Sequence, residues 1–201
     1  LQGQLTHDTR LLADGRTLLA AANTPQGRVV ALLRLRQGEH GIDALLPRDL
    51  AAPMVARLRR FVLRARVDVR VADDLRVVWV RGGAAALGTV AIDEGASVWF
   101  DYAPVRQVVA APEPVLHRLL GSQPAVDAPG VENEWWSADV AAGLPQVFAA
   151  SSEAFVPQML NLDLLDAISF SKGCYTGQEI VARTQNLGRI KRRTARLRLP
   201  A

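Results

Sequence analysis

The sequence is short of the residues that build metal centres and disulfides. Its 201 residues include one Cys and three His, namely Cys174, His7, His40 and His117. A single Cys excludes a disulfide framework, and this set fits no recognised spacing for a tetrahedral zinc site. We therefore expect no structural zinc and assign no metal ligands.

Long apolar runs and processing signals are missing as well. No stretch approaches the roughly 18 apolar residues of a membrane-spanning helix, and LQGQLTHDTR at the start lacks the basic and apolar regions of a secretory signal. The expected location is the cytoplasm, with no membrane partner. Because the chain starts at Leu1 without Met and stops in mid-pattern at RLRLPA, we expect it to be a piece of a longer protein.

The motifs of several large enzyme classes are absent too. The sequence holds no phosphate-binding G-x-x-x-x-G-K-[ST] loop, no G-x-G-x-x-G turn, no G-x-S-x-G elbow and no H-E-x-x-H helix. What it does hold is 49% hydrophobic and 22% charged residues, which fits one or two domains with a buried core and excludes a disordered chain.

The net charge of +4 is concentrated near the C-terminal end. Residues 189–198 hold six of the 24 basic side chains and no acid, so residues 1–188 carry 18 basic against 20 acidic groups. A short basic segment without aromatic interleaving is more typical of a solvated strand face than of an RNA site. Direct nucleic-acid binding is therefore expected to be weak, above about micromolar, and strongly salt-dependent.

Hydrophobic periodicity predicts strands with a few helices between and after them. A helix is expected over 50–63 behind an Asp49 cap, and a shorter one over 115–121, before a Gly-, Ser- and Pro-rich linker at 121–130. This mixture is typical of an α+β protein. Period-two alternation predicts the strands 29–36, 40–47, 66–71, 75–80, 97–102 and 105–110.

The only thiol lies in the segment SKGCYTGQEIVAR, residues 171–183. Thr176 and Glu179 form a T-x-x-E pattern, which predicts a capping box and a helix that starts at Gly177. Glu179 and Arg183 have the i,i+4 spacing of an ion pair on that helix.

Two interpretations of Cys174 follow from this setting. A lone Cys is most often a small buried hydrophobe. Against that, Lys172 and the positive end of the predicted helix favour the thiolate form, and the glycines at 173 and 177 permit close approach of a ligand. An apolar core position is seldom bracketed by such polar residues, which argues for an exposed, reactive thiol, but the residues alone leave both interpretations open.

The string KGCYTGQEIVAR closely resembles the signature of the YgfZ family, the folate-binding, glycine-cleavage-T-protein-like proteins that include mitochondrial iron–sulfur assembly factors. Upstream, LQGQLTHD resembles the family's LQGQLTND start, with His7 in place of the usual Asn. A third stretch, FVPQMLNL at 155–162, precedes the signature. The resemblance covers essentially the whole chain.

The resemblance implies an α+β fold like that of the glycine-cleavage T-protein, with two α+β domains and a central folate channel. Residues 1–48 and 122–191 would form a discontinuous folate-binding domain that carries the signature. Residues 49–121 would form a second, helix-on-sheet domain. Residues 192–201 would begin a C-terminal β-barrel that is absent or truncated here.

The resemblance also assigns site residues. Lys172 and Cys174 match the pair that the family uses functionally, with Lys172 expected to stabilise the thiolate. Gln178 and Glu179 match the G-Q-E and are expected to contact folate, and Asp8 is a weaker folate candidate.

A tryptophan is the fifth folate candidate. Trp135 matches the residue that lies against folate in the family, where an indole face stacks on a pterin or aminobenzoyl ring. The alternative is a Trp that packs its own helix. In the first case Trp136 would face the core. One departure is Ala141, where relatives often carry a carboxylate.

Three functions are compatible with these residues. The resemblance implies a tetrahydrofolate-binding accessory protein in iron–sulfur cluster assembly or repair, which supports tRNA modification indirectly, without classical turnover. Its partners would be iron–sulfur enzymes or assembly proteins. One Cys cannot hold a cluster alone, since four ligands are usual, so Cys174 would either supply one thiolate ligand to a transiently shared cluster or act as a redox thiol.

The alternative is a folate-dependent one-carbon (aminomethyl) transferase resembling the T-protein, with Asp8 as the carboxylate near folate N5. A nucleic-acid-binding module acting through GRIKRRTARLRL ranks last because it lacks any known RNA-binding signature.

Overall fold

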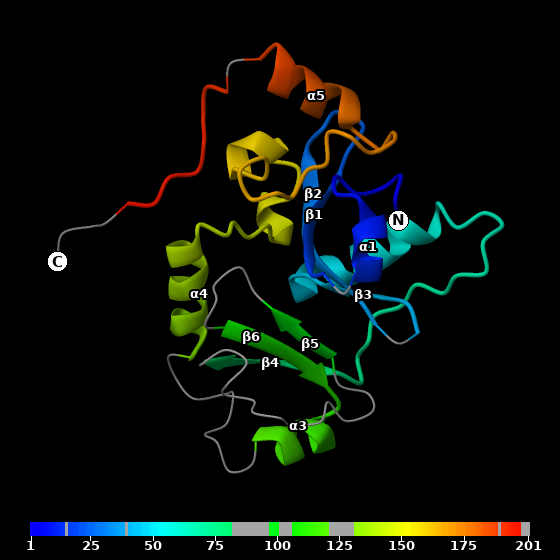
Figure 1. The fold of residues 1–201 in the computed structure, drawn as a ribbon, viewed down its shortest axis with the longest axis vertical. Coiled ribbons are helices and arrows are strands. Elements are labelled where there is room, and N and C mark those ends of the chain that lie inside the picture. The colour runs from blue at the N-terminus through cyan, green and yellow to red at the C-terminus, as the bar shows by residue number, and fades with distance from the viewer. Residues whose placement is uncertain are drawn as a thin grey trace. The chain divides into compact units, whose positions relative to one another are not determined.

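The computed structural model describes residues 1–14, 16–38, 40–81, 97–100, 106–120, 131–188 and 190–197 (Figure 1). The chain divides into two units. The first unit comprises Leu1–Val71 and Leu144–Ala201, and the second unit comprises Ala72–Gly143. Among the described residues, no helix is both long and apolar enough to cross a bilayer.

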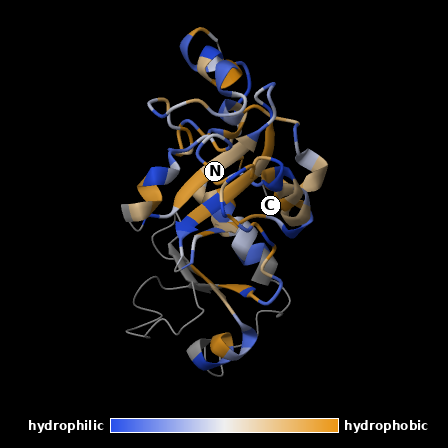
Figure 2. Cartoon of the chain, turned by 90° about the vertical axis from the view of Figure 1, so that its right-hand side faces the viewer, coloured by the Kyte–Doolittle hydropathy of each residue, from blue (hydrophilic) through white to orange (hydrophobic). Residues whose placement is uncertain are grey.

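The first unit is built on an antiparallel sheet with the strand order β1-β2-β3. The strands are β1 (Leu18–Asn23), β2 (Val29–Gln37) and β3 (Ile42–Leu45), so the predicted strands 29–36 and 40–47 are confirmed with shifted ends. All six residues of β1 are buried. A strand buried on both faces shows no period-two alternation, which is why the sequence analysis missed β1. Much of this sheet is orange in Figure 2, because its strands consist largely of hydrophobic residues.

Helix α1 (Arg48–Arg59) packs Leu50 and Met54 into the core of the first unit. The predicted Asp49 cap is wrong, because Pro47 is the N-cap and Asp49 lies in the first turn. There its carboxylate accepts a hydrogen bond from the Ala149 backbone N–H at 2.8 Å. The helix also ends before residue 63, since Leu63 is exposed and has no core to join.

The first unit also contains short 3-10 helices and one helix near its end. The 3-10 helices are η1 (Thr9–Asp14), η2 (Ala149–Ser151) and η3 (Pro157–Leu160), and the last helix is α5 (Gln178–Asn186). Residues 190–197 form no strand, so the expected start of a β-barrel is not seen in this described stretch.

The second unit holds an antiparallel sheet with the order β4-β6-β5. Its strands are β4 (Arg76–Arg81), β5 (Ser97–Phe100) and β6 (Arg106–Ala111), which confirms three predicted strands. The strand predicted at 66–71 is wrong, because β4 pairs with β6 instead of a preceding hairpin partner.

Two helices accompany this sheet, α3 (Glu113–Leu120) and α4 (Val131–Ala142). The helix predicted over 115–121 corresponds to α3, which buries Val115 and Leu116. The predicted linker 121–130 lies outside the described residues.

The unit boundaries differ from the domains drawn from the sequence. Helix α1 belongs to the first unit although 49–121 was expected to form the second domain, and α4 belongs to the second unit although 122–191 was assigned to the folate-binding domain. The physical reason for α1 is its anchoring: the Arg57 guanidinium donates to the Asn23 carbonyl at 2.6 Å. The helices and strands together confirm the α+β class.

Candidate functional site

The two segments that carry the strongest sequence motifs lie against each other in the first unit. We call Leu1–Asp8 the N-terminal segment and Ser171–Gly177 the thiol loop. The Thr176 N–H donates to the Gly3 carbonyl at 3.1 Å, and the Ser169 N–H donates to the Thr6 carbonyl at 3.0 Å. Residues separated by more than 160 positions thus form one surface.

Lys172 is the buried centre of this surface, with 6% of its area exposed. Its ammonium donates to the backbone carbonyls of Leu5 at 2.8 Å, of His7 at 2.9 Å and of Gln2. An ammonium has three N–H donors, so all of them are used. The Tyr175 ring lies 5.2 Å from Nζ, within the range of a cation–π contact.

Burial lowers the pKa of Lys172 to about 8, and the negative charge of Asp8 partly opposes that shift. The ammonium is therefore mostly protonated at neutral pH. Because all three donors are spent on carbonyl oxygens, Lys172 has none left for the thiol, and an effect of its charge on the thiolate stays a prediction.

The Cys174 thiol is exposed, which makes the buried-hydrophobe interpretation wrong. Gly173 beside it is equally open, because a Cβ added there would meet no atom within 4 Å. Among the described residues, nothing donates a hydrogen bond to the sulfur or accepts one from it. The thiol is accessible to a reagent or a partner.

Helix α5 begins differently from the predicted capping box. Its N-cap is Gly177, with a left-handed φ of 82°, and no side chain caps it. Thr176 points its hydroxyl toward Gln4 at 3.5 Å, and the Gln178 amide oxygen accepts the Tyr175 backbone N–H at 3.2 Å. The predicted Glu179–Arg183 ion pair is present at 3.0 Å.

The start of α5 packs closely against the turn between β1 and β2, with Gly177 and Gly27 at the contact (Figure 1). The sequence analysis did not predict this contact. A Cβ on Gly177 would lie 2.5 Å from the Thr24 carbonyl oxygen and 3.0 Å from the Gly27 Cα. A Cβ on Gly27 would lie 2.8 Å from the Ile180 Cβ. The only sequence signal for Gly27 was its place in the turn TPQG.

Asp8 closes the N-terminal segment with a dense set of hydrogen bonds. Its carboxylate accepts from the Arg10 guanidinium at 2.6 and 2.9 Å and from the Gln2 side-chain amide at 2.9 Å. The Arg10 guanidinium holds the pKa of Asp8 well below its usual range. Asp8 is therefore a fixed negative charge and a poor proton acceptor.

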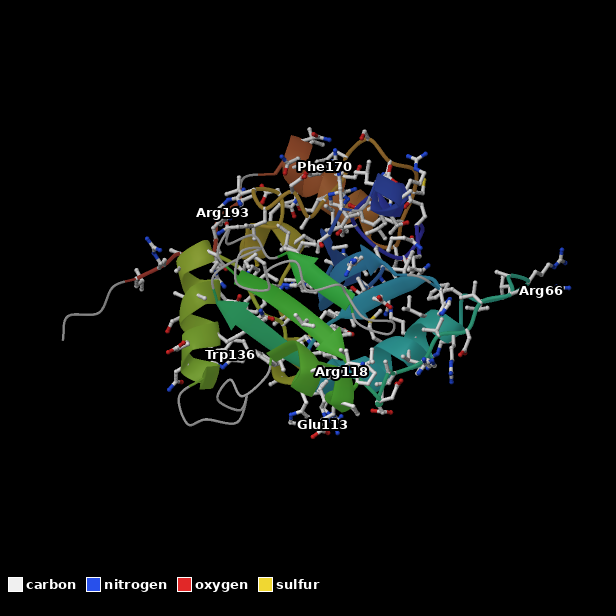
Figure 3. All side chains as sticks on the ribbon, turned by 60° about the horizontal axis from the view of Figure 1, so that its bottom comes forward. Arg66, Glu113, Arg118, Trp136, Phe170 and Arg193 are labelled. Atoms are coloured by element: carbon white, nitrogen blue, oxygen red, sulfur yellow. The ribbon has the colours of Figure 1, made fainter. Side chains whose placement is uncertain are left out.

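The predicted tryptophan lies in the second unit, on α4. Trp135 is half-buried there, and its contact with folate stays a prediction. Trp136, labelled in Figure 3, is 39% exposed, so the expectation that it faces the core is wrong.

No group of three or more His, Cys, Asp or Glu side chains that could hold a metal ion occurs among the described residues.

A clamp near the C-terminal end of the first unit was not predicted either. The Arg193 guanidinium, labelled in Figure 3, donates to both oxygens of the Asp163 carboxylate at 2.7 and 2.9 Å. The Thr194 N–H donates to the Met159 carbonyl at 2.8 Å, and the Asn161 amide donates to the Thr194 carbonyl at 2.8 Å. These bonds hold residues 193–194 against η3 and the turn that follows it.

The clamp makes a testable contribution to stability. Asp163→Asn should cost about 1–3 kcal/mol of unfolding free energy, because the two-point charged contact with Arg193 is lost. Arg193 lowers the pKa of Asp163, so the contribution is fully present above the ordinary aspartate pKa of about 4 and is lost as pH falls through the native value. Urea unfolding of the wild type and of Asp163→Asn across this pH range measures the difference in their unfolding free energies. A difference that stays the same in acid would contradict the prediction.

The fold and the surface define an α+β protein with one exposed thiol on a glycine-bounded loop held by the start of the chain. No family model matches the chain. The chain is 32% identical over 206 residues to the tRNA-modifying protein YgfZ of Escherichia coli O157:H7 (strain EC4115 / EHEC) and 31% identical to that of Shigella sonnei (strain Ss046). Each match covers 96% of this chain and 63% of the relative. The chain belongs to the YgfZ family.

Proposed function

We propose that the protein binds tetrahydrofolate or a derivative and acts as an accessory protein in iron–sulfur cluster assembly or repair, through which it supports tRNA modification. The observation that carries the proposal is the exposed Cys174 thiol on a loop fixed by the N-terminal segment. The relatives' name, tRNA-modifying protein, supports a connection to tRNA. The chain spans 63% of the length of those relatives. The proposed function is therefore that of a full-length protein and is not assigned to these 201 residues alone.

The thiol surface suits a transient role better than a resident cluster. A cluster usually takes four protein ligands, and the sequence offers one Cys. An exposed thiolate can supply one ligand to a cluster that a partner enzyme or assembly protein also holds. That role is consistent with an accessible sulfur that makes no hydrogen bond to the part of the chain that the structure describes.

The folate candidates are unequal in the structure. Asp8 and Glu179 are engaged by Arg10 and Arg183, so either would have to leave an ion pair to bind a pterin. Gln178 keeps its side-chain N–H groups without a partner among the described residues, and these could donate to a folate carbonyl or carboxylate. A bound tetrahydrofolate would supply a carrier for one-carbon units.

The electrostatics of Asp8 favour the accessory role over a one-carbon transferase. A transferase needs a carboxylate that exchanges protons or stabilises charge near folate N5. Arg10 keeps Asp8 ionised and neutralised at once, which makes it a weak base. The accessory role requires no proton transfer at this position.

Trp135 gives the first test of the folate site. Trp135→Ala should weaken tetrahydrofolate binding by roughly three- to tenfold, the loss expected for one stacked indole, and leave the unfolding temperature nearly unchanged. Calorimetric titration gives the affinity, and Trp136→Ala is the matched control on the neighbouring, exposed residue. Unchanged affinity, or simple unfolding of the Trp135 variant, would make Trp135 a packing residue.

The cellular half of the proposal has its own experiment. Cells that lack the protein should show reduced activity of cluster-dependent tRNA-modifying enzymes, and the intact gene should restore it. Normal activity of cluster enzymes in the deleted strain would contradict the proposal.

A further inference from the structure

Three backbone carbonyls of the N-terminal segment converge on one ammonium. The carbonyls of Gln2, Leu5 and His7 accept from Lys172, and no backbone N–H of the described residues is recorded as donating to any of the three. A buried carbonyl that is left without a donor destabilises the folded state. The ammonium therefore satisfies three backbone acceptors of this segment at once, in addition to the bonds that Thr6 makes with Ala21 and Ala167.

The same segment holds the polar groups at both sides of the surface. The Gln2 side chain donates to the Asp8 carboxylate at 2.9 Å, and the Gly3 carbonyl accepts the Thr176 N–H of the thiol loop at 3.1 Å. Gln2 and Gly3 lie directly beside the carbonyls that Lys172 binds. The ammonium, the Asp8 carboxylate and the thiol loop are thus all bonded to the stretch Gln2–Gly3.

We propose that Lys172 is a positioning residue whose ammonium acts as a tethered cation, folding the N-terminal segment onto the thiol loop so that Cys174 stays presented to a partner. The inference deepens the proposed function and rests on it for the role of Cys174. Its physical basis is the three-carbonyl cage, the burial of Lys172 and the Tyr175 ring beside Nζ.

If Lys172 acts only as a cation that binds carbonyls, a free cation should replace it in a variant that lacks the side chain. A free cation would not restore a reaction in which the Lys172 amine itself takes part. In Lys172→Ala the cage loses its cation but keeps its carbonyl oxygens. Methylammonium offers three N–H donors, and K⁺ binds carbonyl oxygens without carrying a proton. Tetramethylammonium has the same charge and no donor, so it controls for ionic strength.

The measurement is amide hydrogen exchange at Thr176 and Ser169, whose N–H groups bond to the N-terminal segment, in the whole protein. In Lys172→Ala these two amides should exchange at least about tenfold faster, which corresponds to an opening free energy lower by about 1.4 kcal/mol. Methylammonium or K⁺ should restore slow exchange at least in part, and tetramethylammonium should not. The rate of Cys174 alkylation should follow the same order of recovery.

Several results would overturn the inference. Native exchange at Thr176 and Ser169 in Lys172→Ala would show that the ammonium holds nothing. Equally accelerated exchange in β1 and α1 would show that Lys172→Ala destabilises the whole first unit. Lys172→Met, which keeps the side-chain volume, tests the same exchange sites with less loss of packing. Native exchange combined with lost cellular function would assign Lys172 to the chemistry itself. If wild-type protein bound no folate, the proposed function would fail while the exchange result would stand.

Discussion

Gly177→Ala is expected to destabilise the first unit by at least about 3 kcal/mol, because two penalties add. The residue has φ +82°, a left-handed conformation that costs an L-residue about 1–2 kcal/mol. Its new Cβ would also lie 2.5 Å from the Thr24 carbonyl oxygen and 3.0 Å from the Gly27 Cα. Both neighbours are backbone atoms, so no side-chain rotation can relieve the overlap.

Urea unfolding measures this effect, and the thiol loop supplies its own control. Gly173→Ala changes the same residue type four positions earlier, where a Cβ meets nothing within 4 Å, and should cost less than about 1 kcal/mol. Gly27→Ala should resemble Gly177→Ala, since its Cβ would lie 2.8 Å from the Ile180 Cβ. Equal stability of the Gly173 and Gly177 variants would contradict the seating of α5 on the β1–β2 turn.

Cys174→Ser should abolish the cellular function while leaving the fold and folate binding intact. The thiol is exposed and makes no hydrogen bond to the described residues, so a hydroxyl of similar size removes no packing. A serine hydroxyl stays protonated at neutral pH and is a poor ligand for iron. The expected outcome is loss of cluster-dependent tRNA modification in cells that carry only the variant.

Ser171→Ala serves as the matched control for Cys174→Ser. Ser171 is an exposed residue of the same loop, and its hydroxyl lies 3.5 Å from that of Ser169. The control should complement fully. Full complementation by Cys174→Ser, together with an unreactive thiol in the native protein, would remove Cys174 from the mechanism.

Local sequence patterns located β2, β6 and α3, which bury apolar side chains, close to their expected positions. β3 also forms within its expected range, but none of its residues is buried and Ile42 is exposed. β1 escaped because it is buried on both faces, so its residues do not alternate. The strand expected at 66–71 alternates correctly but finds no neighbouring strand, and alternation alone cannot supply one.

The site was predictable where it depends on local residues and not where it depends on distant ones. The signature and the first residues were both recognised, and the structure joins them through Thr176 and Gly3. The capping box failed because a left-handed glycine ends the loop, and a Thr side chain is not needed there. The carbonyl cage around Lys172 involves backbone groups about 165 residues away, which no local pattern encodes.

Calorimetric titration of the whole protein with tetrahydrofolate, and with its 5-formyl and 5,10-methylene forms, tests the central claim most directly. The account predicts saturable binding at one site, weaker in Trp135→Ala and unchanged in Cys174→Ser. Similar affinity for all three forms would agree with an accessory use of folate. No saturable binding of any form would contradict the account.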